Sequence, residues 1–168
     1  MGFLRVFGII VGIVILLIGI VFVAARLSDG PFGLIAGGAL TSGELVTGPD
    51  PDWRFVHDIE TIEFQLLDPP RSRTTWILEH DGKIYIPCGY MDTQVGRLWK
   101  QWPIEAERDG RAVIRVAGKR YERELVRIHD GPSIEPLVKQ INEKYGAPAR
   151  VADVTSNSLW LFELKPTG

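Results

Sequence analysis

The feature that most constrains this chain is an uninterrupted apolar stretch near its start. Twenty consecutive uncharged residues run from Val6 to Ala25. At about 1.5 Å of rise per residue, a helix of this length spans roughly 30 Å, the thickness of a bilayer's hydrocarbon core. A cleavable signal peptide is the alternative, but its apolar region usually has only about 7 to 15 residues. The sequence therefore predicts an uncleaved, single-pass membrane anchor over residues 1–27.

The charges flanking this stretch predict its orientation in the lipid bilayer by a small margin. Arg5 and the α-amino group lie on one side, Arg26 lies on the other, and the next basic residue is Arg54. Because positive charge is retained on the cytoplasmic side, we expect the domain to be extracytoplasmic. Gly8 and Gly12 are spaced so that two spanning helices could approach closely, although glycine is common in such helices in any case.

The next segment, residues 28–52, is rich in glycine and proline. These residues recur too often for a helix or a long strand, which predicts a linker or a wrapping segment. The pair Gly37 and Gly38 suggests a phosphate-binding loop, but no Lys-Ser/Thr follows it, so that motif is absent. The segment has more apolar residues than a solvated tether, and we expect it to lie against the domain. These residues are Phe32, Leu34, Ile35, Leu40, Leu45 and Val46.

Charge and composition argue against several functions for the remaining residues, 53–168, which are long enough for one domain. A net charge of -2 is unlike that of a general nucleic-acid binder, which needs a basic excess. The single cysteine, Cys88, excludes an intrachain disulfide. With His57, His80 and His129 far apart, no standard metal-ligand spacing can be assembled, so we expect no metal site.

Alternation of apolar residues predicts that residues 53–168 are mainly β. Ile62, Phe64 and Leu66 alternate with polar residues, the period of a half-buried strand. Asp81-Gly82 lies between two β-forming runs and predicts a two-residue type I′ hairpin, in which Glu79 faces Ile84 and Leu78 faces Tyr85. Both faces of this hairpin are apolar at mid-strand. We therefore expect a barrel wall that also contacts a second layer or subunit.

Further elements follow along the chain. We expect strands over residues 112–116, 120–128 and 159–164, and a short helical turn ending at Pro103. Ser133 is a candidate N-cap for one amphipathic helix that closes at Gly146. The second strand pair carries an arginine-rich run, which we interpret as a solvated sheet edge whose charges deter strand addition. The run holds Arg111, Arg115, Lys119, Arg120, Arg123 and Arg127.

The run Arg71–Thr75, "RSRTT", is the strongest candidate for a ligand grip. The planar fork of arginine matches phosphate, and threonine hydroxyls on a strand can complete the coordination. The predicted register puts Arg73 and Thr75 on one face and Thr74 on the other, so these residues cannot all hold one ligand. The candidate is therefore Arg73 with Thr75, helped by Arg71, and the alternative is a solvated strand start.

The order of these elements resembles a known superfamily. It is similar to the order in split β-barrel proteins of the pyridoxamine-phosphate-oxidase-like and deazaflavin-dependent nitroreductase type. The segments that carry the resemblance are the run "RSRTTWILEHDGKIYIP", a connection closing on "LWKQWP", the run "AVIRVAGKRYERELVRI" and then an amphipathic helix. The resemblance implies a flavin mononucleotide (FMN) or deazaflavin cofactor. Its phosphate would be held at Arg71 or Arg73, at Thr75, and at Lys100 just before Trp102-Pro103.

Two functions follow from these observations. The first is a membrane-anchored, oxidoreductase-like protein that binds flavin or deazaflavin, with a split β-barrel domain that could form a homodimer through its barrel face. The alternative is a non-enzymatic anchored module that has kept the fold without the cofactor. Such a module would bind a protein or lipid partner through residues 28–52 and the aromatic side chains of Trp99 and Trp102. The substrate and any catalytic residues stay open.

Overall fold

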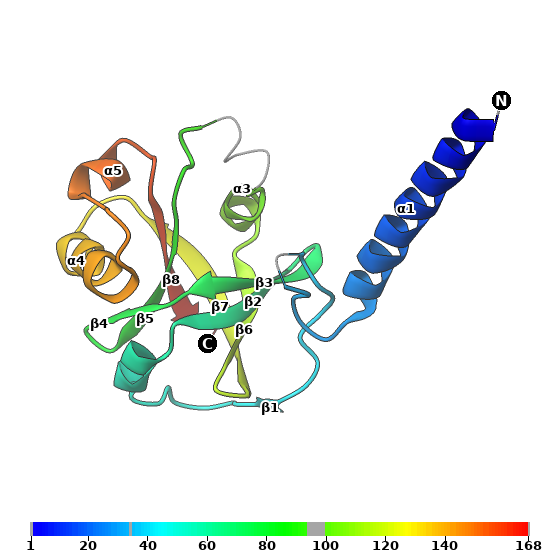
Figure 1. Ribbon diagram of the computed structural model, residues 1–168. Helices are drawn as coiled ribbons and strands as arrows, with labels where there is room; N and C mark the ends of the chain where they lie inside the picture. Colours follow the sequence, from blue (N-terminus) through cyan, green and yellow to red (C-terminus); the bar gives the residue numbers. More distant parts are fainter. Residues whose placement is uncertain (1, 34, 94–99, 168) are drawn as a thin grey trace.

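The predicted anchor is a single long helix. The computed structural model describes residues 1–168 except 1, 34, 94–99 and 168. Helix α1 (Gly2–Leu27) projects away from the rest of the chain, and its apolar side chains are exposed almost throughout (Figure 1). Length and composition make it able to cross a membrane, a test that a signal sequence near an N-terminus also passes. The structure thus contains an exposed apolar helix where the sequence predicts an anchor.

The described part of the remaining chain forms one eight-stranded, mainly antiparallel sheet, which confirms the mainly β prediction. The path through the sheet is β3-β2-β6-β7-β8-β5-β4, and β1 pairs parallel to β7. The strands are β1 (Glu44–Leu45), β2 (Thr61–Leu67), β3 (Pro70–Trp76), β4 (Leu78–His80), β5 (Lys83–Cys88), β6 (Arg111–Val116), β7 (Lys119–Ile128) and β8 (Trp160–Pro166). The two ends of the path, β3 and β4, are consecutive in the chain.

Only Ile77 separates β3 from β4. Side chains of helix α4 (Ile134–Tyr145) form hydrogen bonds with the backbone N–H and carbonyl of Ile77. The Tyr145 hydroxyl accepts from the Ile77 N–H at 3.0 Å and lies 2.7 Å from the Ile77 carbonyl oxygen. Lys144 Nζ donates to the carbonyls of Ile77 at 3.0 Å and Val56 at 2.7 Å. Because buried backbone groups need partners, these two side chains allow the strand to change neighbours, from β2 before Ile77 to β5 after it.

The β4–β5 hairpin confirms the predicted turn and register. Asp81 and Gly82 have φ angles of 54° and 73°, as a type I′ turn requires, and Leu78 pairs with Tyr85. Ile84 and Ile86 point into one hydrophobic core, whereas Leu78 and Tyr85 point into another. The prediction that both faces of this hairpin are buried is therefore correct, and the second layer is helical.

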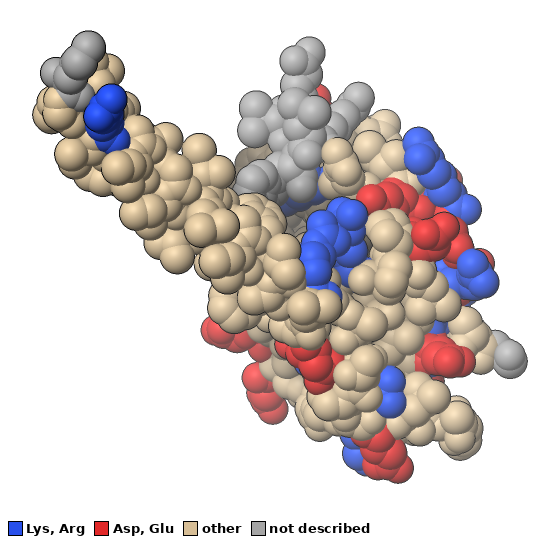
Figure 2. Space-filling view, turned by 90° about the vertical axis from the view of Figure 1, so that its right-hand side faces the viewer, with Lys and Arg blue, Asp and Glu red and all other residues tan. Residues whose placement is uncertain are grey.

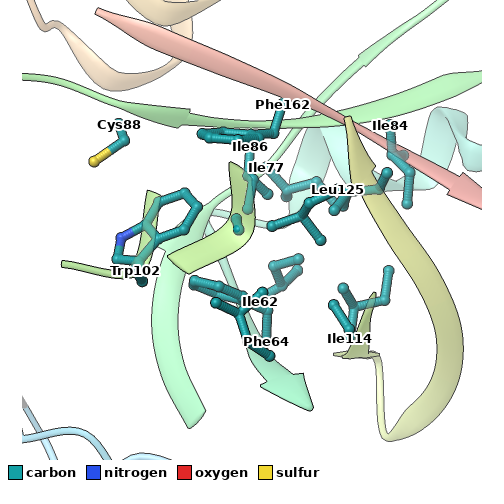
Figure 3. Packing of buried hydrophobic residues seen from close by; sticks show 14 of the residues in the cluster. Ile62, Phe64, Ile77, Ile84, Ile86, Cys88, Trp102, Ile114, Leu125 and Phe162 are labelled. Carbon is teal, nitrogen blue, oxygen red and sulfur yellow. The ribbon is translucent and has the colours of Figure 1, made fainter. Parts of the chain in front are cut away.

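Two cores lie on the two faces of the sheet. Figure 3 shows side chains of the first core, which come from separate strands and from α3 and pack against one another. The first core includes Ile62, Phe64, Ile77, Ile84, Ile86, Cys88, Trp102, Ile114, Leu125 and Phe162. The second core lies between the sheet and helices α4 and α5 (Val151–Thr155), and contains Leu78, Tyr85, Ile134, Leu137, Val138, Ile141, Val154, Leu159 and Leu161.

Helix α4 ends at Gly146 in the left-handed conformation, as predicted, but Ser133 makes no side-chain cap. The helical turn predicted before Pro103 lies partly outside the described residues, but its predicted end at Pro103 is wrong. Instead, α3 (Trp102–Arg108) begins there, because proline lacks an N–H and suits the first turn of a helix. Helix α5 and the 3-10 turn η1 (Trp53–Asp58) have no counterpart among the sequence predictions.

The arginine-rich strand pair is not a solvated edge, so that prediction is also wrong. Strands β6 and β7 lie inside the sheet, between β2 and β8. Their arginine side chains contact carboxylates or backbone carbonyls of the protein. Arg115 pairs with Asp29 and Glu63, Arg120 donates to the carbonyls of Leu40 and Gly43, Arg123 pairs with Asp50, and Arg127 pairs with Glu107.

Several of these arginines hold residues 28–52 against the domain, as expected of a wrapping segment. Leu40 is buried, and the backbones of Gly37 and Ser72 exchange hydrogen bonds of 3.0 and 3.4 Å. A Cβ on Gly37 would lie 1.7 Å from the Gly30 carbonyl oxygen. Phe32, by contrast, is 53% exposed. Gly37 and Gly38 lie so close to other backbone atoms that a side chain at either position would not fit.

Candidate functional site

A pocket of about 690 Å³ lies where β3, β5 and the connections to α3 and β8 meet. Its walls come from segments far apart in the chain. Strand β3 contributes Thr74, Thr75 and Trp76, and the end of β5 contributes Pro87 and Cys88. The following loop adds Gly89, Tyr90, Asp92, Thr93 and Lys100, α3 adds Trp102, and the region around α5 adds Arg150, Asp153 and Leu159. The volume is typical of a small-molecule site.

Two of the four predicted site residues line this pocket. Thr75 and Lys100 are 25 positions apart in the chain, yet both lie in its wall. Arg71 and Arg73 are not among the lining residues, although they share one face of β3 with Thr75, as the pairing of Arg73 with Phe64 and Thr75 with Ile62 requires. The structure thus separates the predicted ligand-binding residues of β3: Thr75 lies at the pocket, whereas Arg71 and Arg73 do not.

Lys100 is a cation of the pocket with no carboxylate partner among the described residues. Its Nζ donates to the Gly89 carbonyl at 3.1 Å and lies 5.3 Å from the centre of the Tyr90 ring. An ammonium group has three N–H donors, so the contact with Gly89 leaves two for a ligand. The hydroxyls of Thr74 and Thr75 have no hydrogen-bond partner within the described residues. Unused donors therefore lie on two sides of the pocket.

Cys88 also lines the pocket, but its environment favours the neutral thiol. The side chain is 4% exposed and its Sγ lies 3.8 Å from Met91 Sδ. Burial raises the pKa of the Cys88 thiol to about 11, against the smaller lowering effects of Lys100 and Arg73. A thiol of this pKa is a poor nucleophile near neutral pH.

The aromatic side chains around the pocket differ in exposure. Trp76 is 38% exposed and one face of its ring stacks on Tyr145, with centroids 4.3 Å apart and an interplanar angle of 5°. Tyr90 is 73% exposed. Trp102, expected to be an exposed partner-binding residue, is buried against Phe64, so that expectation is wrong. Trp99, named with it, lies outside the described residues.

Sequence analysis missed Tyr90, Asp92, Arg150 and Asp153. Tyr90 has a φ of 65°, a conformation uncommon for a bulky side chain. Arg150 Nη2 lies 3.3 Å from Asp153 Oδ1, and the same carboxylate accepts the Arg150 backbone N–H at 2.8 Å, so its charge is largely compensated. The "GAPAR" run before α5 looked only like a helix terminator. No periodic signal links it to β3.

Arg71 and Arg73 lie instead beside α3 and the base of α1. Arg73 Nη2 is 3.7 Å from Glu105 Oε2, and Arg73 Nη1 is 3.4 Å from the Arg71 carbonyl oxygen. Burial lowers the pKa of Arg73; Glu105 opposes this shift, and the charges of Arg71 and Arg26 add to it. Arg71 Nε is buried without a hydrogen-bond partner in the described structure. Arg71 and Arg26 are therefore near enough to Arg73 for their charges to act on it.

Comparison with solved structures finds chains of similar fold. The chain is similar to the crystal structure of conserved hypothetical protein Rv2991 from Mycobacterium tuberculosis, with a TM-score of 0.49 and 13% sequence identity over 73% of this chain and 87% of that one. No protein-family model and no curated protein matches the chain. A likeness of this size assigns no function, so the candidate site rests on the geometry of the pocket.

Proposed function

We propose that this chain is a membrane-anchored, oxidoreductase-like protein whose sheet closes as a split β-barrel and whose pocket binds a flat, phosphate-bearing cofactor, FMN or a deazaflavin. The observation that supports this most is the meeting of Thr75 and Lys100 in one pocket. A hydroxyl on a rigid strand and an ammonium group opposite it are suitable donors for a phosphate. When bound, the cofactor would supply hydride transfer, while the protein positions it.

In this proposal the two kinds of pocket wall have different tasks. Lys100 offers two N–H donors and Thr75 offers a hydroxyl, so these two residues would hold the phosphate. Trp76 and Tyr90 present exposed ring surface, so they would lie against the planar part of the cofactor. Asp153 is compensated by Arg150 and would repel the phosphate little. Arg71 and Arg73 take no part in this arrangement.

Titration of the full-length, detergent-solubilised protein with FMN and with a deazaflavin tests the proposal through changes in visible absorbance and fluorescence. Lys100→Gln removes a charge-assisted hydrogen bond worth about 1.5–3 kcal/mol, so we expect affinity to fall roughly ten- to hundredfold. Lys139→Gln is the matched control, since Lys139 is exposed on α4 and does not line the pocket. Failure of the wild-type protein to bind either cofactor would refute the proposal.

A second function is favoured by the position of Arg71 and Arg73. The resemblance assigns the phosphate partly to these arginines, yet they do not line the pocket. A cofactor-free, anchored binding module that has kept the fold would show this separation, because the selection for a shared phosphate grip is gone. The same titration distinguishes the two functions, since the module binds neither FMN nor deazaflavin in wild-type or Lys100→Gln form.

The side of the membrane is a separate expectation. The charges around α1 favour an extracytoplasmic domain. A reporter fused after the C-terminus, active only in the cytoplasm, should therefore stay inactive. An active reporter would contradict this orientation and would show that the domain, with its pocket, lies in the cytoplasm, where flavin cofactors are synthesised.

A further inference from the structure

The base of α1 is attached to the domain rather than joined by a loose tether. Ser28 Oγ donates to the carbonyl of Ala25 at 2.7 Å, and Ala25 is fully buried. A Cβ on Gly38 would lie 2.6 Å from the Arg26 carbonyl oxygen, while the neighbouring Gly37 pairs with Ser72 on β3. Residues 28–38 thus hold the end of the helix beside β3.

This attachment brings together a positively charged group of residues, here called the junction cluster: Arg26, Arg71 and Arg73. Arg26 is exposed in the last turn of α1, and Arg71 and Arg73 flank Ser72 on β3. Figure 2 shows basic side chains gathered where the apolar helix meets the domain. Glu105 is the carboxylate paired with this cluster, at 3.7 Å from Arg73, which leaves a local excess of positive charge.

Among the described residues, two arginines of the cluster have no paired carboxylate. Within the described residues, neither Arg26 nor Arg71 forms an ion pair, and Arg71 Nε is buried with no acceptor. The arginines of β6 and β7, by contrast, contact carboxylates or carbonyls, although the Nε atoms of Arg123 and Arg127 also lack a partner within the described residues. Gathering like charges in a half-buried place costs free energy unless an anion offsets it.

The level of the cluster along α1 indicates which anion that is. The large apolar side chains of α1 are exposed up to Val23, and Arg26 follows three residues later, at the height where a spanning helix meets the headgroup region. Leu27, the next residue, is 83% exposed, and Phe32, six positions after Arg26, is 53% exposed. Exposed apolar groups beside basic ones suit the boundary between acyl chains and headgroups.

We propose that Arg26, Arg71 and Arg73 bind the phosphate of an anionic lipid headgroup at the membrane surface where α1 enters the domain. This rests on α1 spanning a bilayer and is independent of cofactor binding in the pocket. The guanidinium forks hold the phosphate, and Leu27 and Phe32 contact the acyl region. The bound lipid sets the height and tilt of the domain on the membrane, because the cluster includes residues of both α1 and β3.

Native mass spectrometry of the full-length protein, released from micelles that contain phosphatidylglycerol or phosphatidylcholine, tests the proposal. The wild-type protein should retain phosphatidylglycerol in preference to phosphatidylcholine. The variant R26Q/R71Q should bind phosphatidylglycerol roughly fivefold more weakly for each arginine removed. R54Q/K139Q is the control with the same charge change, since Arg54 and Lys139 are exposed and lie outside the cluster.

A charge-retaining variant, R26K/R71K, keeps the test decisive if the glutamine variant folds poorly, and it should keep most of the preference. Equal retention of the two lipids by the wild-type protein would overturn the proposal. So would an equal loss of preference in R54Q/K139Q, which would reflect net charge alone. Displacement of phosphatidylglycerol by millimolar inorganic phosphate would identify a site for free phosphate instead.

Discussion

Arg115 Nη1 donates to Asp29 Oδ2 at 2.9 Å and so joins a strand inside the sheet to the segment that follows the apolar helix. The same carboxylate accepts the backbone N–H of Thr41 at 2.7 Å, and Arg115 Nε donates to Glu63 on β2. One arginine therefore connects β6, β2 and residues 28–52. Asp29 has no periodic pattern around it, so its role depends entirely on this tertiary contact.

Replacing Asp29 with asparagine should loosen the wrapping segment. The amide can keep one hydrogen bond but loses the charge that pairs with Arg115, and we expect a cost of about 1 kcal/mol. For a chain of this length that lowers the melting temperature by about 2–4 °C, measured by circular dichroism in detergent micelles. Asp130→Asn is the matched control, because Asp130 is exposed and has no ion pair in the described structure. Equal melting temperatures for both variants would contradict this role.

The same carboxylate predicts a dependence of stability on pH. Hydrogen bonds, first from Ser42 and also from Thr41 and Arg115, hold the pKa of Asp29 well below its ordinary value of 3.8. A lowered pKa means that the folded state favours the ionised form, so its contribution to stability is present above about pH 3.8 and is lost as the pH falls further. The difference in melting temperature between wild type and Asp29→Asn should therefore shrink below pH 4. A difference that stays constant down to pH 2 would exclude this linkage.

Tyr145→Phe should destabilise the domain at the point where β3 becomes β4. The hydroxyl is the partner of the Ile77 N–H and also lies 2.9 Å from the Glu60 carbonyl oxygen. Burial raises the pKa of Tyr145 to about 12, which keeps this hydroxyl protonated under ordinary conditions. Its loss leaves a half-buried backbone N–H without a partner, at a cost of about 1–3 kcal/mol in urea unfolding. Tyr90→Phe, at an exposed ring, should change the unfolding free energy little; a comparable loss there would argue against the assignment.

Cys88 should react slowly with iodoacetamide in the folded protein. A pKa near 11, two units above the ordinary value of 9.0, lowers the thiolate fraction at pH 8 roughly 100-fold relative to the unfolded chain. Because Cys88 is the single cysteine, mass spectrometry reports its labelling directly. Labelling in urea provides the reference rate. Similar rates in the presence and absence of urea would show that the thiol is neither buried nor shifted.

Local patterns were sufficient for much of the fold. Alternation identified β2, Asp81-Gly82 identified the hairpin turn and its register, and Gly146 identified the end of α4, because each signal depends on residues a few positions apart. The two apolar faces of the β4–β5 hairpin also indicated correctly that a second layer covers the sheet. Pro103 was misinterpreted, since proline both follows helices and begins them, and only the packing of Trp102 against Phe64 distinguishes these cases.

The sequence by itself determined the apolar helix, the mainly β character and the placement of Arg73 and Thr75 on one face of their strand, because side-chain spacing along one strand or helix decides them. Only the tertiary structure decided that Thr75 and Lys100 share a pocket while Arg71 and Arg73 join Arg26 at the base of α1. The residues of "RSRTT" are neighbours in the chain, but β3 passes from the base of the helix to the pocket along its length. Which of its side chains meets which partner therefore depends on contacts with residues far away in the sequence.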